Sequence, residues 1–226
     1  MSEDNREDIL PANVGYTFIS LISQKTRVLV VGGGRAGFTK ARTYAKRGCS
    51  VYVVAQSFIN EFDSLAHMNN VVLKEESYSK SHIIDKHLVI IAVSEDNLIE
   101  EIVRDCEISF KLYLNCSNFK DGIFVTAVQG ETDSIAFALH TKAGGPKAAL
   151  FLAGIIEGKL KEYDGLIKYI SALRNKVKGM TLKEEMMEFV SSEDFKFFYS
   201  RNAHKEVLQM FYGGIDIEFK DSNKTK

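Results

Sequence analysis

The sequence predicts an α/β fold: a doubly wound parallel sheet, then a short strand-rich segment, then a helical C-terminal domain. Three observations predict it. Apolar, β-branched runs alternate with helical patterns over the first ~115 residues, as βαβ units require. Two strand-like runs within residues 122–141 then interrupt the alternation, and helical periodicity dominates from Pro146 onward. We therefore expect domains at 1–115, 116–145 and 146–226.

Five apolar runs are expected to form the strands of the parallel sheet. They are Arg27–Val31, Val51–Ala55, Val71–Lys74, His87–Val93 and Leu112–Asn115. The first two are continuous rather than alternating, which is typical of strands that are buried on both faces. Apolar residues at helical spacing predict helices between them, at Arg35–Arg47, Ile59–His67 and Asn97–Cys106. A short apolar run at Tyr16–Ser23 predicts one further strand ahead of the sheet.

The second half of the chain is expected to contain one pair of strands and then only helices. The two strands are joined by the polar stretch Gly130–Asp133. Pro146 suits the first turn of a helix, and further helices are expected at Tyr163–Arg174, Leu182–Val190 and Ala203–Tyr212. Four aromatic residues are expected to pack in a core or a dimer interface: Phe195, Phe197, Phe198 and Tyr199. We expect a loose arm at 1–15 and a disordered tail at 221–226.

The composition argues against several classes of protein. The formal net charge is −1, so no overall basic field would attract nucleic acid or an anionic membrane. No apolar run approaches the ~20 residues that span a bilayer, and the acidic start MSEDNREDIL is unlike a signal peptide. Three cysteines without CxxC spacing argue against a disulfide framework or a zinc site. We expect a cytoplasmic protein without a resident metal ion.

A glycine pattern typical of dinucleotide binding follows the first strand. Gly32, Gly34 and Gly37 fit G-x-G-x-x-G between a strand and a helix. The first glycine permits a tight turn, the second lets the backbone approach a pyrophosphate, and the third lets the helix pack close to the strand. Free N–H groups at the start of the helix would receive the phosphates. We predict a Rossmann-like site in which the pyrophosphate is held by Gly32, Gly33, Gly34, Arg35 and Ala36, with Gly37 completing the motif.

The dinucleotide is expected to be NAD. A nicotinamide site usually carries Asp or Glu at the end of the second strand, bonded to the ribose hydroxyls. Here Gln56 and Ser57 follow that strand and could act as neutral partners. No arginine follows at once to favour a 2′-phosphate, so NAD is mildly preferred over NADP. After the fourth strand, Ala92, Val93 and Ser94 are expected to border the nicotinamide.

Four longer segments of the sequence resemble a known protein family. The segments are RVLVVGGGRAGFTKARTYAKRGCSVYVVAQSFINEF, LVIIAVSEDNLIEEIV, YLNCSNFKDGIFVTAVQ and IAFALHTKAGGPKAALFLAGIIE, in that order. Over about residues 14 to 160 they resemble precorrin-2 dehydrogenases and sirohydrochlorin ferrochelatases, the siroheme synthase family. The resemblance implies an NAD-dependent oxidoreductase that converts the tetrapyrrole precorrin-2 to sirohydrochlorin. It also implies a homodimer formed through 116–145.

This chain departs from the family where the chemistry is expected. The aspartate that the family uses as acid and base falls at Cys116 or, with one gap, at Ser117. Asp121, in the turn FKDG, and His140, at the end of an apolar strand, are further catalytic candidates. Each has a structural alternative: turn geometry for Asp121, a plain strand end for His140 and a buried small side chain for Cys116.

Basic residues could serve the same site. Lys142 and Lys147 flank a glycine turn, where the resemblance implies contact with the carboxylates of a tetrapyrrole. Solvent exposure on the surface is the alternative for both lysines. It is also the alternative for Arg35 and Lys40 on the first helix.

Two other functions stay open on the sequence. The missing carboxylate also fits a non-catalytic module that binds a tetrapyrrole or NAD(H). The resemblance further implies sirohydrochlorin ferrochelatase or cobaltochelatase activity, in which His140 would take part. An enzyme that works mainly by positioning and by cofactor chemistry would tolerate the loss of the aspartate.

Overall fold

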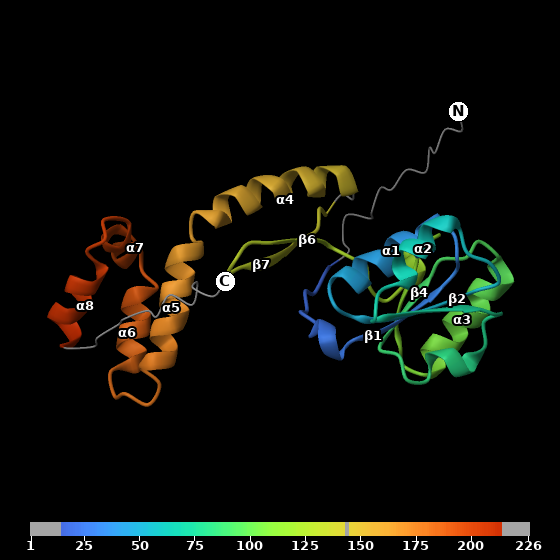
Figure 1. The fold of residues 1–226 in the computed structure, drawn as a ribbon, viewed down its shortest axis with the longest axis horizontal. Helices are drawn as coiled ribbons and strands as arrows, with labels where there is room; N and C mark the ends of the chain where they lie inside the picture. The colour runs from blue at the N-terminus through green and yellow to red at the C-terminus, as the bar shows by residue number, and fades with distance from the viewer. Residues whose placement is uncertain (1–14, 143–144, 214–226) are drawn as a thin grey trace. The chain divides into compact units, whose positions relative to one another are not determined.

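The structure is a computed structural model and describes residues 15–142 and 145–213. The described residues form two compact units, divided between Thr126 and Ala127; Figure 1 shows their elements. Apart from Gly15, the expected N-terminal arm and C-terminal tail lie outside the described residues. The division into three domains stays a prediction.

The first unit contains a five-stranded sheet in which every pairing is parallel. Its strands are β1 (Arg27–Val31), β2 (Ser50–Ala55), β3 (Val71–Glu75), β4 (Leu88–Ile91) and β5 (Leu112–Asn115). They pair in the order β3-β2-β1-β4-β5. The predicted doubly wound sheet is therefore confirmed. Because the chain builds outward from β1 to β3 and then returns to place β4 beside β1, the topological switch point lies between β1 and β4.

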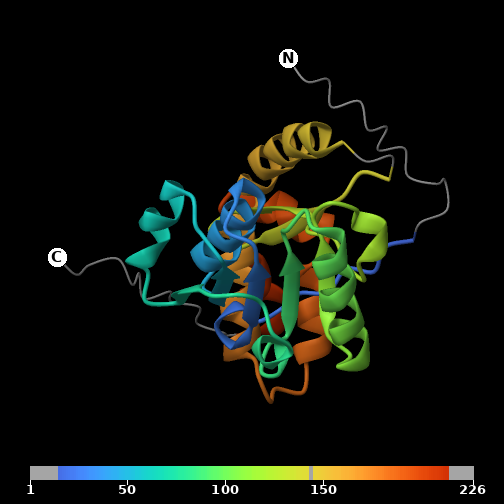
Figure 2. The same cartoon turned by 90° about the vertical axis from the view of Figure 1, so that its right-hand side faces the viewer.

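Helices cover both faces of this sheet, as Figure 2 shows for α1 and α3. On one face lie α1 (Arg35–Lys46), the 3-10 turn η2 (Asn60–Phe62) and α2 (Asp63–Ala66); on the other lie η3 (Lys80–Ile83) and α3 (Asp96–Ile108). Successive residues of β1 alternate between the two apolar layers, since strand side chains point to opposite faces. Val28 and Val30 pack toward α1, and Leu29 and Val31 pack toward α3.

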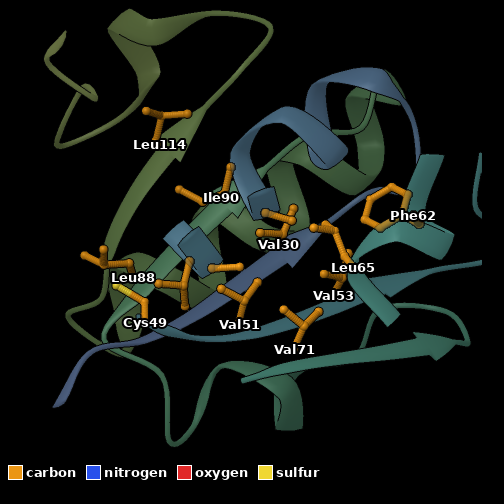
Figure 3. Packing of buried hydrophobic residues seen from close by; sticks show 13 residues of the cluster. Val30, Cys49, Val51, Val53, Phe62, Leu65, Val71, Leu88, Ile90 and Leu114 are labelled. Carbon is orange, nitrogen blue, oxygen red and sulfur yellow. The ribbon is translucent and has the colours of Figure 1, made fainter. Parts of the chain in front are cut away.

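Figure 3 shows the layer on the α1 side. Val30, Val53 and Ile90 come from three neighbouring strands, and Phe62 and Leu65 cover them from the helical side. All five side chains are almost completely buried. Burial on both faces is the physical reason that β1 and β4 are apolar without alternation, whereas the edge strand β3 exposes Val72, Lys74 and Glu75. The layer fixes the strand ends from which the functional loops emerge.

Some predicted elements differ in the structure. The strand expected at Tyr16–Ser23 is wrong: residues 15–22 form neither helix nor strand, and Ser23–Lys25 forms a 3-10 turn, η1. The apolar side chains of this segment are mostly exposed, with Phe18, Ile19 and Ile22 each more than half exposed, so no burial against the sheet stabilises a strand here. The helix expected at Ile59–His67 is divided into η2 and α2. A further 3-10 turn, η4 (Phe119–Asp121), follows β5.

The second unit holds an antiparallel ribbon and a group of helices (Figure 1). The ribbon consists of β6 (Val128–Glu131) and β7 (Ala136–Leu139), which confirms the predicted strand pair, although Gly130 and Glu131 belong to β6 and not to the connection. The helices are α4 (Pro146–Lys161), α5 (Asp164–Lys176), α6 (Lys183–Val190), α7 (Glu193–Ser200) and α8 (His204–Tyr212). Helix α7 was not predicted, although its aromatic residues were noted. Phe195 from α7 is fully buried in the core, as expected, whereas Phe197 is half exposed.

One carboxylate fastens the ribbon to the helices. Asp164, the first residue of α5, accepts hydrogen bonds from the Thr132 hydroxyl at 2.6 Å and from the Ser134 N–H at 2.9 Å. The Thr132 hydrogen bond is the main reason that the pKa of Asp164 lies below its usual range. The turn between β6 and β7 is thereby held at the start of α5.

Candidate functional site

The glycine loop after β1 is shaped by contacts that only glycine allows. Gly32 has φ +127°, and a Cβ there would lie 2.3 Å from the carbonyl oxygen of Ala92. A Cβ on Gly33 would lie 1.9 Å from the Ser57 carbonyl oxygen, and one on Gly37 would lie 2.0 Å from the Gly32 carbonyl oxygen. The loop is therefore packed against the ends of both β2 and β4.

Gly34 differs from these three glycines because it faces open space. No described atom lies within 4 Å of the position that its Cβ would take. It is the N-cap of α1 and has no side chain with which to cap the helix. The first turn of α1 contains Arg35 and no acidic residue. An uncapped, unhindered helix start with exposed N–H groups is suited to a diphosphate, so the residues present fit a dinucleotide.

Neutral groups follow β2, where a ribose is expected. Gln56 and Ser57 are both exposed, and Gln56 Nε2 donates a hydrogen bond to Ser77 Oγ at 3.3 Å. The Ile59 N–H donates to the Gly33 carbonyl oxygen at 3.0 Å, which keeps this turn close to the glycine loop. Ser77 was missed by the sequence reasoning, since it follows a different strand.

The loops after β4 and β5 are joined to each other. Ala92 continues from β4 with its N–H bonded to the Val31 carbonyl oxygen at 2.8 Å. Ser117 Oγ donates to the Val93 carbonyl oxygen at 3.2 Å, and Ser94 is exposed beside them. The structure thus brings together Ala92, Val93 and Ser117, which the sequence had placed at the nicotinamide and at the reacting centre.

Asn115 organises the end of β5 and was missed as a site residue. It is only 2% exposed, and its Oδ1 accepts a hydrogen bond from the Ser117 N–H at 2.9 Å. Its Nδ2 donates to Asp121 Oδ2 at 3.4 Å, so the exposed Asp121 carboxylate is drawn back to the strand end. A polar residue that closes an apolar strand was the available signal, because buried amides need partners.

Cys116 is a half-buried thiol on the α1 side of the sheet. Its N–H donates to the Ile91 carbonyl oxygen at 2.9 Å, and its side chain packs against the α1-side apolar layer. Burial raises the pKa of the thiol, which therefore stays protonated near neutral pH and is a poor nucleophile. Nearby, Lys40 is half-buried rather than fully solvated, and its Nζ lies 3.5 Å from Thr126 Oγ1.

The remaining candidates belong to the second unit. His140 directly follows β7 and is half-buried, while Lys142 and Lys147 are exposed. Cys116, Ser117 and Asp121 belong to the first unit. The three cysteines are free thiols. Among residues 15–142 and 145–213, no three or more His, Cys, Asp or Glu side chains are grouped so as to hold a metal ion, and no helix has the length and apolar character to cross a membrane.

Comparison with known proteins agrees with this architecture. Residues 19–127 match a family model described as "Putative NAD(P)-binding". The chain is 24% identical over 204 residues to a "Putative precorrin-2 dehydrogenase" of Methanocaldococcus jannaschii, covering 87% of this chain and 98% of that protein. It is 24% identical over 193 residues to a siroheme synthase of Psychrobacter cryohalolentis, covering 81% of this chain but only 36% of that longer protein.

A solved structure has the same fold. SirC, a precorrin-2 dehydrogenase, superposes with a TM-score of 0.64 at 16% identity, and the match covers 86% of this chain and 98% of SirC. The agreement therefore extends beyond the sheet to the ribbon and helices of the second unit. The chain is thus similar, over most of its length, to proteins named as precorrin-2 dehydrogenases, and its first unit matches an NAD(P)-binding family model.

Proposed function

We propose that this chain is an NAD-dependent dehydrogenase that oxidises precorrin-2 to sirohydrochlorin in siroheme biosynthesis. The observation that carries the proposal is the open start of α1 at Gly34, set at the switch point of the sheet. The choice of substrate is supported by the archaeal relative named as a precorrin-2 dehydrogenase, because that match runs over 98% of the relative's length.

The dinucleotide would be held by main-chain groups of the glycine loop. The N–H groups of Gly34, Arg35 and Ala36 would face the pyrophosphate, with Gly32 and Gly33 keeping the loop close to the strand ends. Gln56 and Ser57 would bond to the adenosine ribose, and Ala92, Val93 and Ser94 would border the nicotinamide. Bound NAD⁺ supplies the hydride acceptor for the oxidation.

The proton that leaves the substrate needs an acceptor in the protein. We assign this role to Asp121, since its carboxylate is held at the end of β5 by Asn115, next to the loop that Ser117 ties to Val93. Cys116 is a weaker candidate because its thiol is protonated near neutral pH and cannot accept a proton in that form. His140 remains a second candidate, from the other unit.

The protein would act as a homodimer in the cytoplasm. A two-stranded ribbon is marginally stable by itself, and β6 and β7 pair only with each other among the described strands. Helix α4 exposes a run of large apolar side chains, among them Leu150, Phe151 and Ile155. Apolar surface of this kind, beside the segment 116–145, suits pairing with a second copy. Three free cysteines suit a reducing compartment.

The direct test is turnover. Purified protein, NAD⁺ and enzymatically prepared precorrin-2 should give NADH, followed by its absorbance, well above a protein-free control. NADH formation no faster than in that control would contradict the enzyme assignment. Tight binding of NAD⁺ or sirohydrochlorin without turnover would instead favour the non-catalytic binding module.

A further inference from the structure

The residue at the expected ribose-binding position, directly after β2, carries no charge. In Rossmann-like sites the residue that follows β2 binds the ribose 2′-hydroxyl, and an acidic residue there is the usual partner for NAD. In this chain the position is held by Gln56. A Cβ on Gly33 would lie 1.9 Å from the Ser57 carbonyl oxygen and 2.9 Å from the Ala55 Cβ. The end of β2 is thus packed directly on the glycine loop, with Gln56 between these two contacts in sequence.

The carboxylate of Glu76, near the end of β2, is paired with a histidine. The Glu76 N–H donates to the Ala55 carbonyl oxygen at 3.0 Å, so its backbone lies beside the end of β2. Its side chain, however, is paired with His82, with Oε1 at 3.1 Å from Nε2. Glu75 is in register with Ala55 on β3, which lies one strand farther from the glycine loop than β2.

Gln56 is instead held by another neutral group. Its Nε2 donates to Ser77 Oγ, two residues beyond β3, at 3.3 Å. The Gln56 amide and the Ser57 and Ser77 hydroxyls can donate hydrogen bonds either to a ribose hydroxyl or to a phosphate. A carboxylate at this position would repel a 2′-phosphate, whereas these groups do not.

We infer that the chain binds NADP about as well as NAD, because the neutral Gln56–Ser77 pair occupies the position from which an acidic residue would exclude the 2′-phosphate. The inference rests on the proposed dinucleotide site and specifies its selectivity. It predicts dissociation constants for NAD⁺ and NADP⁺ that agree within about tenfold.

A charge series at one residue tests the inference. The full-length chain and its variants Gln56→Glu and Gln56→Arg would be titrated with NAD⁺ and with NADP⁺ at low salt, where charge effects are least screened. Gln56→Glu should weaken NADP⁺ relative to NAD⁺ by at least about tenfold, and Gln56→Arg should shift the ratio the opposite way. The matched control is Gln209→Glu, which adds the same charge at an exposed position of α8 and should leave the ratio unchanged.

The outcomes separate this inference from the proposed function. The selectivity inference is wrong if the unaltered chain binds NAD⁺ more than about tenfold more tightly than NADP⁺. It is also wrong if the ratio of the two dissociation constants does not change with the charge at residue 56. In either case the proposed dinucleotide site still stands. If neither nucleotide binds, the proposed site and the inference fall together.

Discussion

The carbonyl oxygen of Ala92 occupies the space beside Gly32, 2.3 Å from the position of a Cβ on that residue. The obstacle is backbone at the end of β4, which cannot move aside as a flexible side chain could. With φ at +127°, Gly32→Ala is strained twice over. It should lower the free energy of unfolding by roughly 2–4 kcal/mol, measured by urea denaturation. Unchanged stability would show that the loop and β4 are not in contact.

Asp121 is predicted to carry the proton transfer. Asp121→Asn should lower kcat by about a hundredfold while leaving the dissociation constant of NAD⁺ unchanged, because the side chain is held at the end of β5, two strands from β1 and its glycine loop. The measurement is steady-state formation of NADH together with a binding titration. Asp63→Asn, an exposed acid in α2, is the matched control and should keep full activity.

Substitution of Asn115 tests the same arrangement through the hydrogen-bond partner of Asp121. Asn115→Ala should lower kcat as well, since Asp121 loses its hydrogen-bond donor and Ser117 N–H loses its acceptor. Breaking these bonds at a buried position should also cost about 1–3 kcal/mol of stability. Full turnover by both variants would show that the acid and base of the reaction does not lie at the end of β5. His140 would then be the next residue to test.

Stability should fall in mild acid because of His204. This residue is 9% exposed. Its ring lies edge-on to Tyr169 with ring centroids 4.7 Å apart and keeps a buried Nδ1 without a hydrogen-bond partner among the described residues. Burial holds the pKa of His204 below its ordinary value of 6.5. At lower pH the unfolded chain therefore takes up a proton that the folded chain does not, and folding loses stability as the pH falls through about 6.5.

The check for His204 is urea unfolding at pH 7 and at about pH 5.5, followed by circular dichroism. His204→Phe keeps an aromatic ring in the core but cannot titrate, so its loss of stability between the two pH values should be smaller. Other histidines contribute equally to both proteins, and the comparison isolates His204. An identical loss in the variant would mean that His204 titrates normally in the folded state.

The dimer should depend on the apolar face of α4. Phe151 is 69% exposed in the single chain, so Phe151→Asp should not disturb its core but should place a charge in the proposed interface. Light scattering should give a dimer mass for the unaltered chain and a monomer mass for the variant. Phe110→Asp, at a residue 94% exposed in the first unit, should remain dimeric. A monomer in every case would reject the homodimer.

Much of the fold could be predicted from the sequence because buried strands and helices have recognisable patterns of apolar residues. The strands β1, β2, β4 and β5 are buried on both faces over most of their length, and their apolar runs predict them. The strand predicted at Tyr16–Ser23 is wrong because an apolar run matches a strand pattern even where, as here, its side chains stay largely exposed. Helix α7 was missed because consecutive aromatic residues blur helical periodicity.

Only the part of the site that is formed by main-chain groups could be predicted from the sequence. The glycine loop follows from local rules, since its turn and close contacts demand glycine. The hydrogen bonds from Asn115 to Asp121 and from Gln56 to Ser77 join residues whose approach depends on a turn or on the next strand. Such pairs carry no periodic signal, so they required the structure.

The loop's role as a dinucleotide site is tested most directly at Gly34, where a Cβ meets no described atom within 4 Å and φ is −85°. Gly34→Ala should therefore fold with unchanged or slightly higher stability, yet its methyl group should hinder a pyrophosphate at the start of α1. Calorimetric titration with NAD⁺ should show saturable binding by the unaltered chain and at least about tenfold weaker binding by the variant. Equal affinities in the two proteins, or no binding by either, would contradict the account.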